Sequence, residues 1–520
     1  MLRSLVDLKQ LKGKSHMGCD RLTSNPKDIR LLPCEIFNKL NPTTLIHKNS
    51  KQLHSRDFHG KLTLLSFGML FLLLFPILNL PLGAFGQPGG PVLRERAEDE
   101  LPARIHDPNL TFETVAEDLN HPTAMAFLGP DDILVTFKDN GTVNRIVDGQ
   151  LQTEPVLDVA VANDNGTNER GLLGMAVAKQ NETTTYVFLY YTESGGGQDG
   201  DDSIGIVPAG NRLYRYELSE TEGANGSEVK LVNPKLLLDL PARPGPRYNS
   251  GPLLVANDGV NNATTVYLLI GDLDHHETQS ENYADGPPPD GTGGILRIDV
   301  NGNPMPNPVL VRDEDEDEND EDEDEVDMLN YYYAYGIRNS FGMAFDPVTG
   351  YLWDTENGPE TFDEVNLVQP GFNSGWHDIQ GLSTADANED VDLEDELVDF
   401  DGTGHYSDPK FVWNNTVGVT ALKFLNSTAL GAEYENDMFV GDINNGRIYH
   451  FDLADDRTEL ALSGVLSDKV ADSPDELDSV IFGSGFRSIS DIEVGPDGYL
   501  YIIMYGPGKI DKILPTNLEQ

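Results

Sequence analysis

The chain has 520 residues and a formal net charge of −51 at pH 7, from 87 acidic and 36 basic side chains. Such an excess of negative charge repels the phosphates of nucleic acids and of anionic lipids, so we exclude nucleic acid as a partner, whereas cations, above all calcium, are favoured. The only two cysteines are Cys19 and Cys34, so the rest of the chain has no disulfide and must fold on its core and on bound metal.

The N-terminal part divides into a basic and an apolar segment. Residues 1–61 hold twelve Lys/Arg against five Asp/Glu, and residues 62–86 (LTLLSFGMLFLLLFPILNLPLGAFG) carry no charge. The apolar segment is long enough to cross a bilayer as one helix, with the basic tail in the cytoplasm and the acidic part outside. A signal peptide cleaved after Gly86 is the alternative, and an over-extended start codon would also explain the basic tail. We therefore expect a cell-membrane protein with an extracellular domain, or a secreted one.

A linker and a set of glycosylation sequons follow. Residues 87–106 are rich in Pro and Gly and then in charge, which predicts a linker. All the Asn-x-Ser/Thr sequons come after the apolar segment, in agreement with an exported glycoprotein. They begin at Asn109, Asn140, Asn165, Asn181, Asn225, Asn262, Asn414 and Asn426.

A hairpin pattern recurs six times between residues 107 and 515. Each copy is a short apolar strand, a turn and a second apolar strand. The first strands are TAMAF, LGMAV, PLLVA, FGMAF, TALKF and SDIEV, and turn sequences such as GPDD, DPVTG and GPDG separate them from the second strands. No intervening segment has the length and period of a substantial helix. The pattern predicts an all-β, six-bladed β-propeller preceded by a single transmembrane or signal helix, with a β-sandwich or two barrels as the alternative.

Two acidic stretches stand apart from the hairpins. Residues 313–325 (DEDEDENDEDEDE) have no hydrophobic side chain, and residues 385–401 are similarly acidic but less extreme. Such segments cannot bury apolar surface, so we predict a disordered acidic insertion over residues 313–327 and solvated loops rather than metal sites.

Five motifs stand in an order that resembles a known family. They are ERGLLGMAV (169–177), LLIGD (268–272), GGILRID (293–299), YGIRNSFGMAFDP (335–347) and GPETFDEVNLVQPGFNSGW (358–376). Together they resemble the glucose/sorbosone dehydrogenases, including the soluble quinoprotein glucose dehydrogenases. The resemblance covers the whole predicted propeller. It implies a six-bladed propeller that binds pyrroloquinoline quinone (PQQ) and calcium and oxidises a sugar by hydride transfer to the quinone.

The resemblance also implies a set of site residues. Arg338 would act in catalysis and contact the quinone and the substrate. Calcium would be held by the loop that carries Gly358, Pro359, Asp363 and Glu364, which offers carbonyl and carboxylate oxygens together. The cofactor would be bound by Glu169, Arg338, Asn339, Asn357, Asn444 and Arg487.

The chain departs from the family where the family has its catalytic histidine. That position carries Tyr248, with Arg247 before it. An unperturbed tyrosine has a pKa of about 10 and is a poor base at neutral pH unless Arg247 or calcium lowers that pKa. His275 and His276 are the alternative bases.

The basic residues with which the family binds the quinone carboxylates are also replaced. Asn444 and Asn445 stand in the place of a lysine-bearing turn, and Ser488 and Ser490 in the place of paired arginines, with Arg487 one residue away from the first. Loss of three cations would weaken the binding of a tricarboxylate.

Three functions follow as hypotheses. The first is a PQQ-dependent sugar (aldose) dehydrogenase. The second is a non-catalytic extracellular propeller that binds carbohydrate or protein, and the third is a calcium-dependent lactonase that uses Asn357, Asp272 and Glu169. A homodimer is expected as the assembly.

Overall fold

The computed structural model describes residues 102–516 apart from 165–167, 224–225, 258–263, 313–326, 386–387, 389–390 and 394–395. The expected basic tail, apolar segment and most of the linker lie outside this part, as does nearly all of the acidic insertion. No helix of the described residues is long and apolar enough to cross a membrane.

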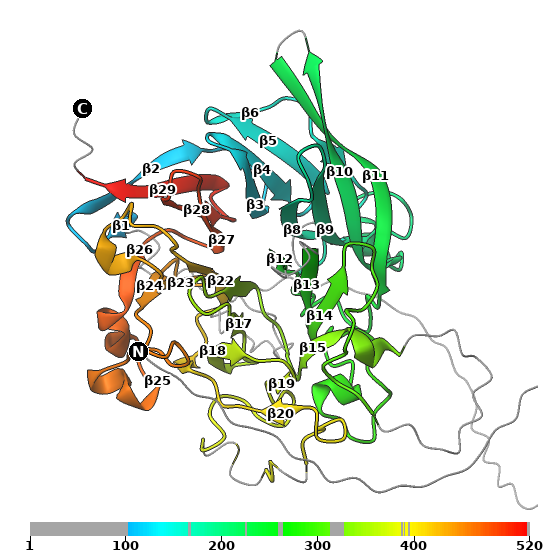
Figure 1. Ribbon diagram of the computed structural model, residues 1–520, viewed down its shortest axis with the longest axis vertical. Coiled ribbons are helices and arrows are strands. Elements are labelled where there is room, and N and C mark those ends of the chain that lie inside the picture. Colours follow the sequence, from blue (N-terminus) through cyan, green and yellow to red (C-terminus); the bar gives the residue numbers. More distant parts are fainter. Residues whose placement is uncertain are drawn as a thin grey trace, which may run out of the picture. The chain divides into compact units, whose positions relative to one another are not determined.

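The described residues are almost entirely β-structure, arranged as six separate sheets (Figure 1). Sheet 1 holds β3 (Pro122–Gly129), β4 (Asp132–Phe137), β5 (Thr142–Val147), β6 (Gln150–Leu151) and β7 (Leu157–Asp158). Sheet 2 holds β8 (Leu172–Lys179), β9 (Thr185–Glu193), β10 (Gly210–Gly223) and β11 (Gly226–Leu240). Sheet 3 holds β12 (Leu253–Asn257), β13 (Thr264–Ile270), β14 (Gly294–Asp299), β15 (Tyr332–Tyr335), β19 (Phe372–Asn373) and β20 (His405–Tyr406).

The C-terminal half forms the other three sheets. Sheet 4 holds β16 (Gly342–Phe345), β17 (Leu352–Glu356), β18 (Thr361–Val368), β21 (Phe411–Asn415) and β25 (Val470–Ala471). Sheet 5 holds β22 (Val419–Phe424), β23 (Met438–Asp442), β24 (Ile448–Phe451), β26 (Ile481–Ser484) and β1 (Arg104–Ile105). Sheet 6 holds β27 (Ile489–Val494), β28 (Leu500–Met504), β29 (Lys509–Pro515) and β2 (Leu110–Ala116). The helices of the described residues are short 3-10 turns: Asp201–Ile204, Gln279–Glu281, Met328–Tyr331, Ala432–Tyr434, Gly464–Asp468 and Pro474–Ser479.

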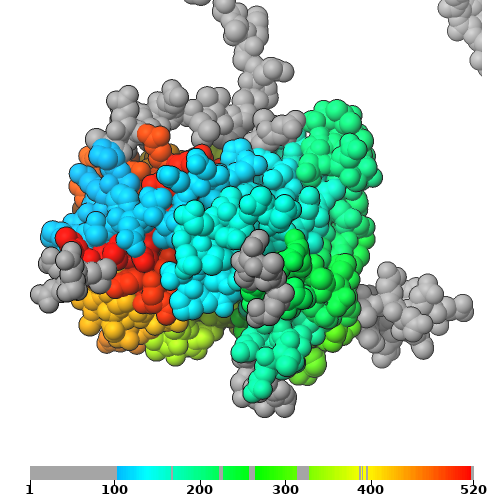
Figure 2. Space-filling model, turned by 90° about the horizontal axis from the view of Figure 1, so that it is seen from above, coloured from blue at the N-terminus to red at the C-terminus, as the bar shows by residue number. Residues whose placement is uncertain are grey.

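The sheets close into a ring, which is the arrangement of a β-propeller. The first strands β3, β8, β12, β16, β22 and β27 contact one another in cyclic order, and the last contacts the first. The N-terminal strand β2 pairs antiparallel with the C-terminal strand β29, so the two ends of the fold complete the same sheet. The blue and red segments lie side by side in Figure 2. β1 pairs with β26, so Arg104 and Ile105, which were expected in the linker, belong to a sheet.

An apolar cluster fills the space between each pair of neighbouring sheets. Phe188 and Leu268 meet between sheets 2 and 3, and Trp353 packs with Val419 between sheets 4 and 5. The other four junctions have clusters of the same kind. These clusters exist because the predicted hairpins are apolar on both faces of each strand, which suits sheets that are covered on both sides.

Hydrogen bonds join the starts of the first strands around the ring. Ser490 Oγ donates to the carbonyl of Pro122, and Thr123 Oγ1 donates to that of Leu172. Ser250 Oγ donates to Asn339 Oδ1, and Thr420 Oγ1 donates to the carbonyl of Ile489. The first strands therefore begin on one common face of the ring, which we call the upper face. Their far ends define the lower face.

Candidate functional site

Arg338 is the centre of the polar group at the upper face. It lies between β15 and β16, and its guanidinium carbon is 3.9 Å from the ring centroid of Tyr248 and 5.3 Å from that of Trp376. One guanidinium nitrogen, Nη1, donates to the carbonyls of Asn357 and Gly358 at 2.8 and 3.1 Å. Its Nε is buried and has no hydrogen-bond partner among the described residues. The geometry fixes a cation between aromatic rings and leaves one buried donor for a ligand.

Glu169 lies beside this cation and joins the starts of three sheets. Its Oε2 accepts hydrogen bonds from the backbone amide of Asn249 at 3.2 Å and from Asn339 Nδ2 at 3.4 Å. Burial of the carboxyl group raises its pKa to about 7, although these hydrogen bonds and Arg338 act in the opposite direction. A carboxylate with such a pKa can accept a proton at neutral pH.

Tyr248 is held against Arg338 in a left-handed backbone conformation, with φ of 57°. The cation on its ring is Arg338 and not the neighbouring Arg247, whose side chain is exposed. The expectation that Arg247 would activate Tyr248 therefore has no support from their positions.

The two histidines proposed as alternative bases have other environments. His276 Nε2 lies 2.5 Å from Asp290 Oδ2, and this hydrogen bond raises the pKa of His276. His275 is exposed, with its ring 6.1 Å from that of Trp376. Trp376 in turn donates from Nε1 to Asp272 Oδ2 at 2.7 Å, so the buried Asp272 orients the indole rather than facing a substrate.

The loop predicted to bind calcium is braced by Asp363. This buried carboxylate accepts from the amide of Gly358 at 3.0 Å and from those of Val417 and Gly418 at 2.7 and 2.6 Å. Burial raises the pKa of Asp363 to about 6. Both of its oxygens are thus engaged by backbone amides. The carbonyl of Gly358 is engaged by Arg338, and Pro359 is exposed.

A cluster of buried acids lies directly below that loop. Asp354 faces Asn366 across β17 and β18, and Glu356 faces Glu364 in the same register. The same face of the hairpin carries Leu352, which packs toward sheet 3. The side chains of all four polar residues, Asp354, Glu356, Glu364 and Asn366, are buried. Both carboxylate oxygens of Asp354 and the Oδ1 of Asn366 have no hydrogen-bond partner within the described residues.

The electrostatics of this acid cluster favour a cation. Burial and the Glu356 carboxylate together raise the pKa values of Glu364 and Asp354 well above their usual range. Burial raises the pKa of Glu356 to about 7. Carboxylate and amide oxygens are the ligands that calcium prefers, and a cation among them would remove the cost of burying these charges.

The remaining predicted cofactor residues, Asn357, Asn444 and Arg487, lie at the upper face of sheets 4, 5 and 6. Asn444 follows β23, and its backbone amide donates to the carbonyl of Val417 at 3.2 Å. Arg487 has φ of 49° and packs closely on Gly446. A Cβ added to Gly446 would lie 2.2 Å from the backbone nitrogen of Arg487. Asn357 donates from Nδ2 to the carbonyl of Val419 at 2.8 Å.

Sequence reasoning missed Asp354, Glu356, Asn249 and Trp376 as members of the site. The signal for the first two was present, because acids two residues apart on one strand point to the same face. Trp376 comes from a loop after β19, and only the fold brings it to Arg338.

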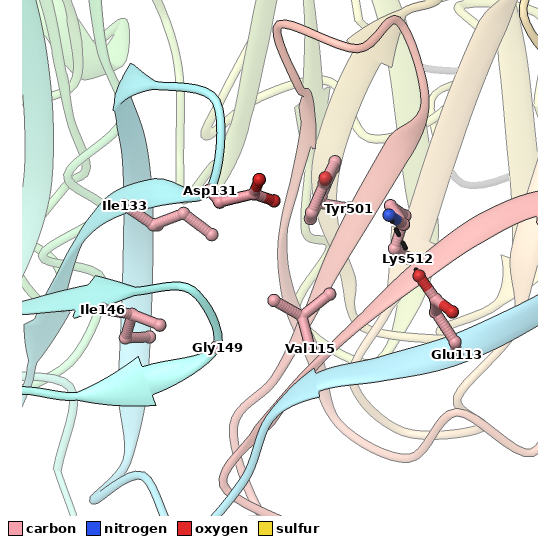
Figure 3. A pocket seen from close by; sticks show the side chains of 8 residues that line it. All are labelled: Glu113, Val115, Asp131, Ile133, Ile146, Gly149, Tyr501 and Lys512. Carbon is pink, nitrogen blue, oxygen red and sulfur yellow. Dashed lines mark ion pairs between the residues drawn. The ribbon is translucent and has the colours of Figure 1, made fainter.

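A separate pocket of about 140 Å³ lies between sheets 1 and 6 (Figure 3). Its lining includes Asp131 and Gly149, which follow the far ends of β3 and β5, so the pocket belongs to the lower face. Lys512 and Glu113 form an ion pair of 2.9 Å at its edge.

The ring of sheets defines the class of β-propeller proteins. The family model for glucose / sorbosone dehydrogenase matches residues 119–512, and the chain belongs to this family.

Similarity to individual members is distant. The chain is 28% identical over 192 residues to aldose sugar dehydrogenase YliI of Escherichia coli, which covers 36% of this chain and 44% of that protein. It is 24% identical over 301 residues to quinoprotein glucose dehydrogenase B of Acinetobacter calcoaceticus, covering 54% of this chain and 55% of that one. The PQQ-bound aldose sugar dehydrogenase of Streptomyces coelicolor superposes with a TM-score of 0.53 and 20% identity, over 78% of this chain and 98% of that chain. The similarity to this solved structure, at 20% identity, shows that the two chains share a fold.

Proposed function

We propose that this chain is a PQQ-dependent dehydrogenase that oxidises a hydroxyl group of an aldose, on a scaffold in which each of the six sheets is one propeller blade. The observation that carries the proposal is the group of Arg338, Tyr248, Glu169 and Asn339 at the upper face. It combines a fixed cation, an aromatic surface and a half-buried carboxylate within the region that the family model matches.

The donor groups of the upper face suit a planar cofactor with carbonyl and carboxylate oxygens, which would lie over the rim, because the hollow beside Arg338 and Trp376 has a volume of about 10 Å³. The unpartnered Nε of Arg338 offers a buried donor to such an oxygen, and the ring of Trp376 offers an apolar surface beside it. Arg338, Asn339 and Arg487 would hold the cofactor, with Asn357 and Asn444 lining the same face. When bound, PQQ would supply the acceptor for a hydride from the substrate carbon.

Glu169 takes the role of base that a histidine has elsewhere in the family. Its deprotonated form would accept the proton of the substrate hydroxyl, and a pKa of about 7 suits this task at neutral pH. The amide of Asn249 and the side chain of Asn339 orient the carboxylate. Tyr248 acts as a surface for Arg338 in this scheme, in place of the catalytic role predicted from sequence.

Calcium belongs, in this proposal, to the acid cluster of Asp354, Glu356, Glu364 and Asn366. The carboxylate oxygens of Asp354 and the Oδ1 of Asn366 are unpartnered and would accept a hard cation. Glu356 and Glu364 would each exchange a hydrogen bond for the ion, because their oxygens accept from Arg338 and Ser374 and from Gly381 and Asn366. Glu364 keeps its predicted role as a metal ligand, whereas Asp363, Gly358 and Pro359 shape the loop above. Asp363 accepts from three backbone amides whereas Glu364 accepts from one, and this difference supports the division.

We propose further that the protein is exported, with residues 62–86 as the membrane anchor or signal segment. The absence of charge in this segment and the position of every sequon after it support this. A homodimer is retained as the proposed assembly.

A binding propeller without catalysis is the second candidate. It is favoured by one feature, the replacement of the family's histidine and of its quinone-gripping cations by Tyr248, Asn444 and Ser488. Such a protein would bind carbohydrate at the upper face without oxidising it.

The test is a titration of the full-length protein with PQQ in the presence of calcium, followed by dye-linked oxidation of a panel of aldoses. We expect saturable PQQ binding and turnover that requires both PQQ and sugar. Saturable sugar binding without PQQ binding or turnover would overturn the dehydrogenase and support the binding propeller. Hydrolysis of a lactone that depends on calcium and not on PQQ would support the lactonase instead.

A further inference from the structure

Asp437, His450 and Asp452 form a second polar cluster, at the lower face of sheet 5. Asp437 directly precedes β23 and Asp452 directly follows β24. Because Met438 pairs with Phe451, the two aspartates are the next opposed positions along the same antiparallel pair. His450 lies two residues before Asp452, so its side chain points to the same face of the sheet. Strand register therefore brings two acids and an imidazole together.

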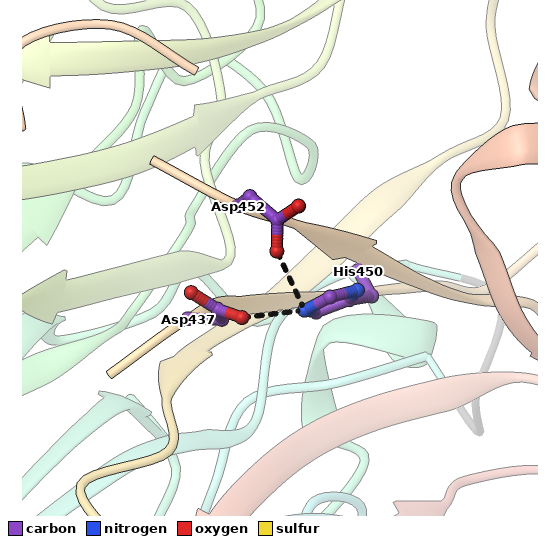
Figure 4. A group of neighbouring side chains, drawn as sticks. All are labelled: Asp437, His450 and Asp452. Carbon is purple, nitrogen blue, oxygen red and sulfur yellow. Dashed lines mark hydrogen bonds and ion pairs between the residues drawn. The ribbon is translucent and has the colours of Figure 1, made fainter. Parts of the chain in front are cut away.

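The three side chains converge on a single point (Figure 4). His450 Nε2 lies 2.9 Å from Asp437 Oδ2 and 3.7 Å from Asp452 Oδ1. One ligand atom of each residue lies within 4.8 Å of the other two, and no other set of three His, Cys, Asp or Glu in the described part of the chain does so.

The hydrogen-bonding capacity of this cluster does not match its charges. A single ring nitrogen carries at most one hydrogen, so Nε2 can donate to only one of the two carboxylates that face it. The other carboxylate remains opposite a like charge, which destabilises a strand pair. A shared cation would satisfy all three groups.

We propose that Asp437, His450 and Asp452 bind a divalent transition-metal ion, for which Zn²⁺ is the suitable probe. One imidazole nitrogen with two carboxylate oxygens is a donor set that suits zinc, whereas calcium prefers oxygen ligands alone. Tetrahedral zinc at about 2.0–2.2 Å from each donor places the donors roughly 3.3–3.6 Å apart, and the two distances to Nε2 bracket this value.

Aromatic rings hold the imidazole in place for this role. The ring of His450 lies 5.2 Å from that of Tyr434 and 5.1 Å from that of Phe439, and its backbone amide donates to the carbonyl of Val480 at 2.8 Å. With three protein ligands and Asp452 largely exposed, a bound ion keeps an open position for water. The site lies at the lower face, so it is independent of the sugar-oxidising site proposed at the upper face.

The experiment is equilibrium dialysis of the full-length protein against Zn²⁺, with bound metal measured by mass spectrometry. The variant Asp452→Asn removes a ligand that is 66% exposed, so folding should survive. Asp455→Asn removes the same charge from an exposed neighbour and is the matched control. Because the N-terminal tail holds Cys19 and Cys34, the quantity compared is the difference in bound zinc between variants.

We expect Asp452→Asn and His450→Gln each to lose one equivalent of zinc, or to bind it at least tenfold more weakly, while Asp455→Asn equals the wild type. The wild type should also gain thermal stability on addition of Zn²⁺, and Asp452→Asn should gain less. Equal zinc uptake by the wild type, Asp452→Asn and His450→Gln would overturn the proposal. A loss shared by Asp455→Asn would do the same, because it would reflect charge and not ligation.

Discussion

The acids on β17 and β18 and the polar groups of the upper face lie close together in the fold but are positioned by different kinds of backbone. Asp354, Glu356 and Glu364 occupy strand positions, where register alone decides which side chains meet. Tyr248 lies in a connection with φ of 57°, a conformation that strands do not adopt. The strand-borne acids form a pattern suited to calcium, while Tyr248 stands in a loop where the resemblance implies a histidine. In the proposed function, the calcium ligands therefore depend on strand register, and the groups that would bind cofactor and substrate depend on the loops.

Replacement of Arg338 should have the largest effect. Arg338→Ala removes the guanidinium between Tyr248 and Trp376, the two hydrogen bonds to the loop carbonyls and the free Nε donor. We expect PQQ-dependent turnover to fall by roughly 100-fold or more, as for the loss of a preorganised electrostatic donor. The measurement is kcat/KM for the sugar, from a dye-linked assay at varied sugar concentration and saturating PQQ. A PQQ titration accompanies it.

Arg247→Ala is the matched control for this experiment. Arg247 is exposed and makes none of these contacts, so turnover should stay within about twofold of the wild type. A large loss in Arg247→Ala, with little in Arg338→Ala, would show that the wrong cation has been assigned.

Removal of calcium should have the next largest effect. At a hundredfold excess over its Kd, a ligand that binds only the folded state stabilises it by roughly 3 kcal/mol. We expect melting in EDTA to occur at a lower temperature than in calcium. Glu364→Gln should abolish most of that difference, because it removes one of the buried oxygens that would bind the ion.

Asp363→Asn separates the loop brace from the proposed calcium site. The change weakens the hydrogen bonds to the amides of Gly358, Val417 and Gly418, so stability should fall by a similar amount with and without calcium. If Asp363→Asn instead removed the calcium effect while Glu364→Gln kept it, the ion would belong to the loop.

The pH dependence of stability follows from the raised pKa values of the buried acids. Burial moves the pKa of Asp363 from 3.8 to about 6 and that of Glu356 from 4.5 to about 7. The folded state therefore binds these protons more tightly than the unfolded chain, and stability falls as pH rises from about 4 to about 7. Chemical denaturation in EDTA at several pH values should show this fall. Calcium should reduce it, because the ion favours the ionised forms, and a midpoint that rises steadily over the same range would contradict the assignment.

Tyr248 offers the smallest expected change. Tyr248→Phe keeps the ring under Arg338 and removes only the hydroxyl, so turnover should change by less than about threefold. A loss of two orders of magnitude would restore the phenol as the catalytic base that the sequence predicted. Tyr248→His, which reinstates the family's residue, is a useful companion variant in the same assay.

The hairpins and their ring order could be predicted from sequence because short-range patterns determine them. The alternation and turns of segments such as TAMAF and DILVTF predict a strand pair, and these segments form β3 and β4. The outer strands were harder to place, because β19, β20 and β25 are two-residue strands with no periodicity to detect. The pairing of β1 with β26 depends on contacts across hundreds of residues.

The site was predictable to the extent that motifs lie on regular structure. Arg338 and Glu364 could be predicted as site residues because each belongs to a motif on or beside a strand. In the structure both take part in polar clusters. The partner of Tyr248 was not predictable, since the nearest basic residue in the chain is Arg247 whereas the nearest in space is Arg338. The alignment of Glu169 with Asn249 and Asn339 likewise depends on three separate sheets meeting at one face.

The assignment of Glu169 as the base is tested most directly by the pH profile of kcat/KM for the wild type and for Glu169→Gln with PQQ and an aldose. The wild type should become more active as pH rises through about 7, where the carboxyl group loses its proton. Glu169→Gln should lose roughly 100-fold or more at pH 8 while its affinity for PQQ stays within a few-fold. Activity in Glu169→Gln close to that of the wild type, with an unchanged pH profile, would contradict the assignment.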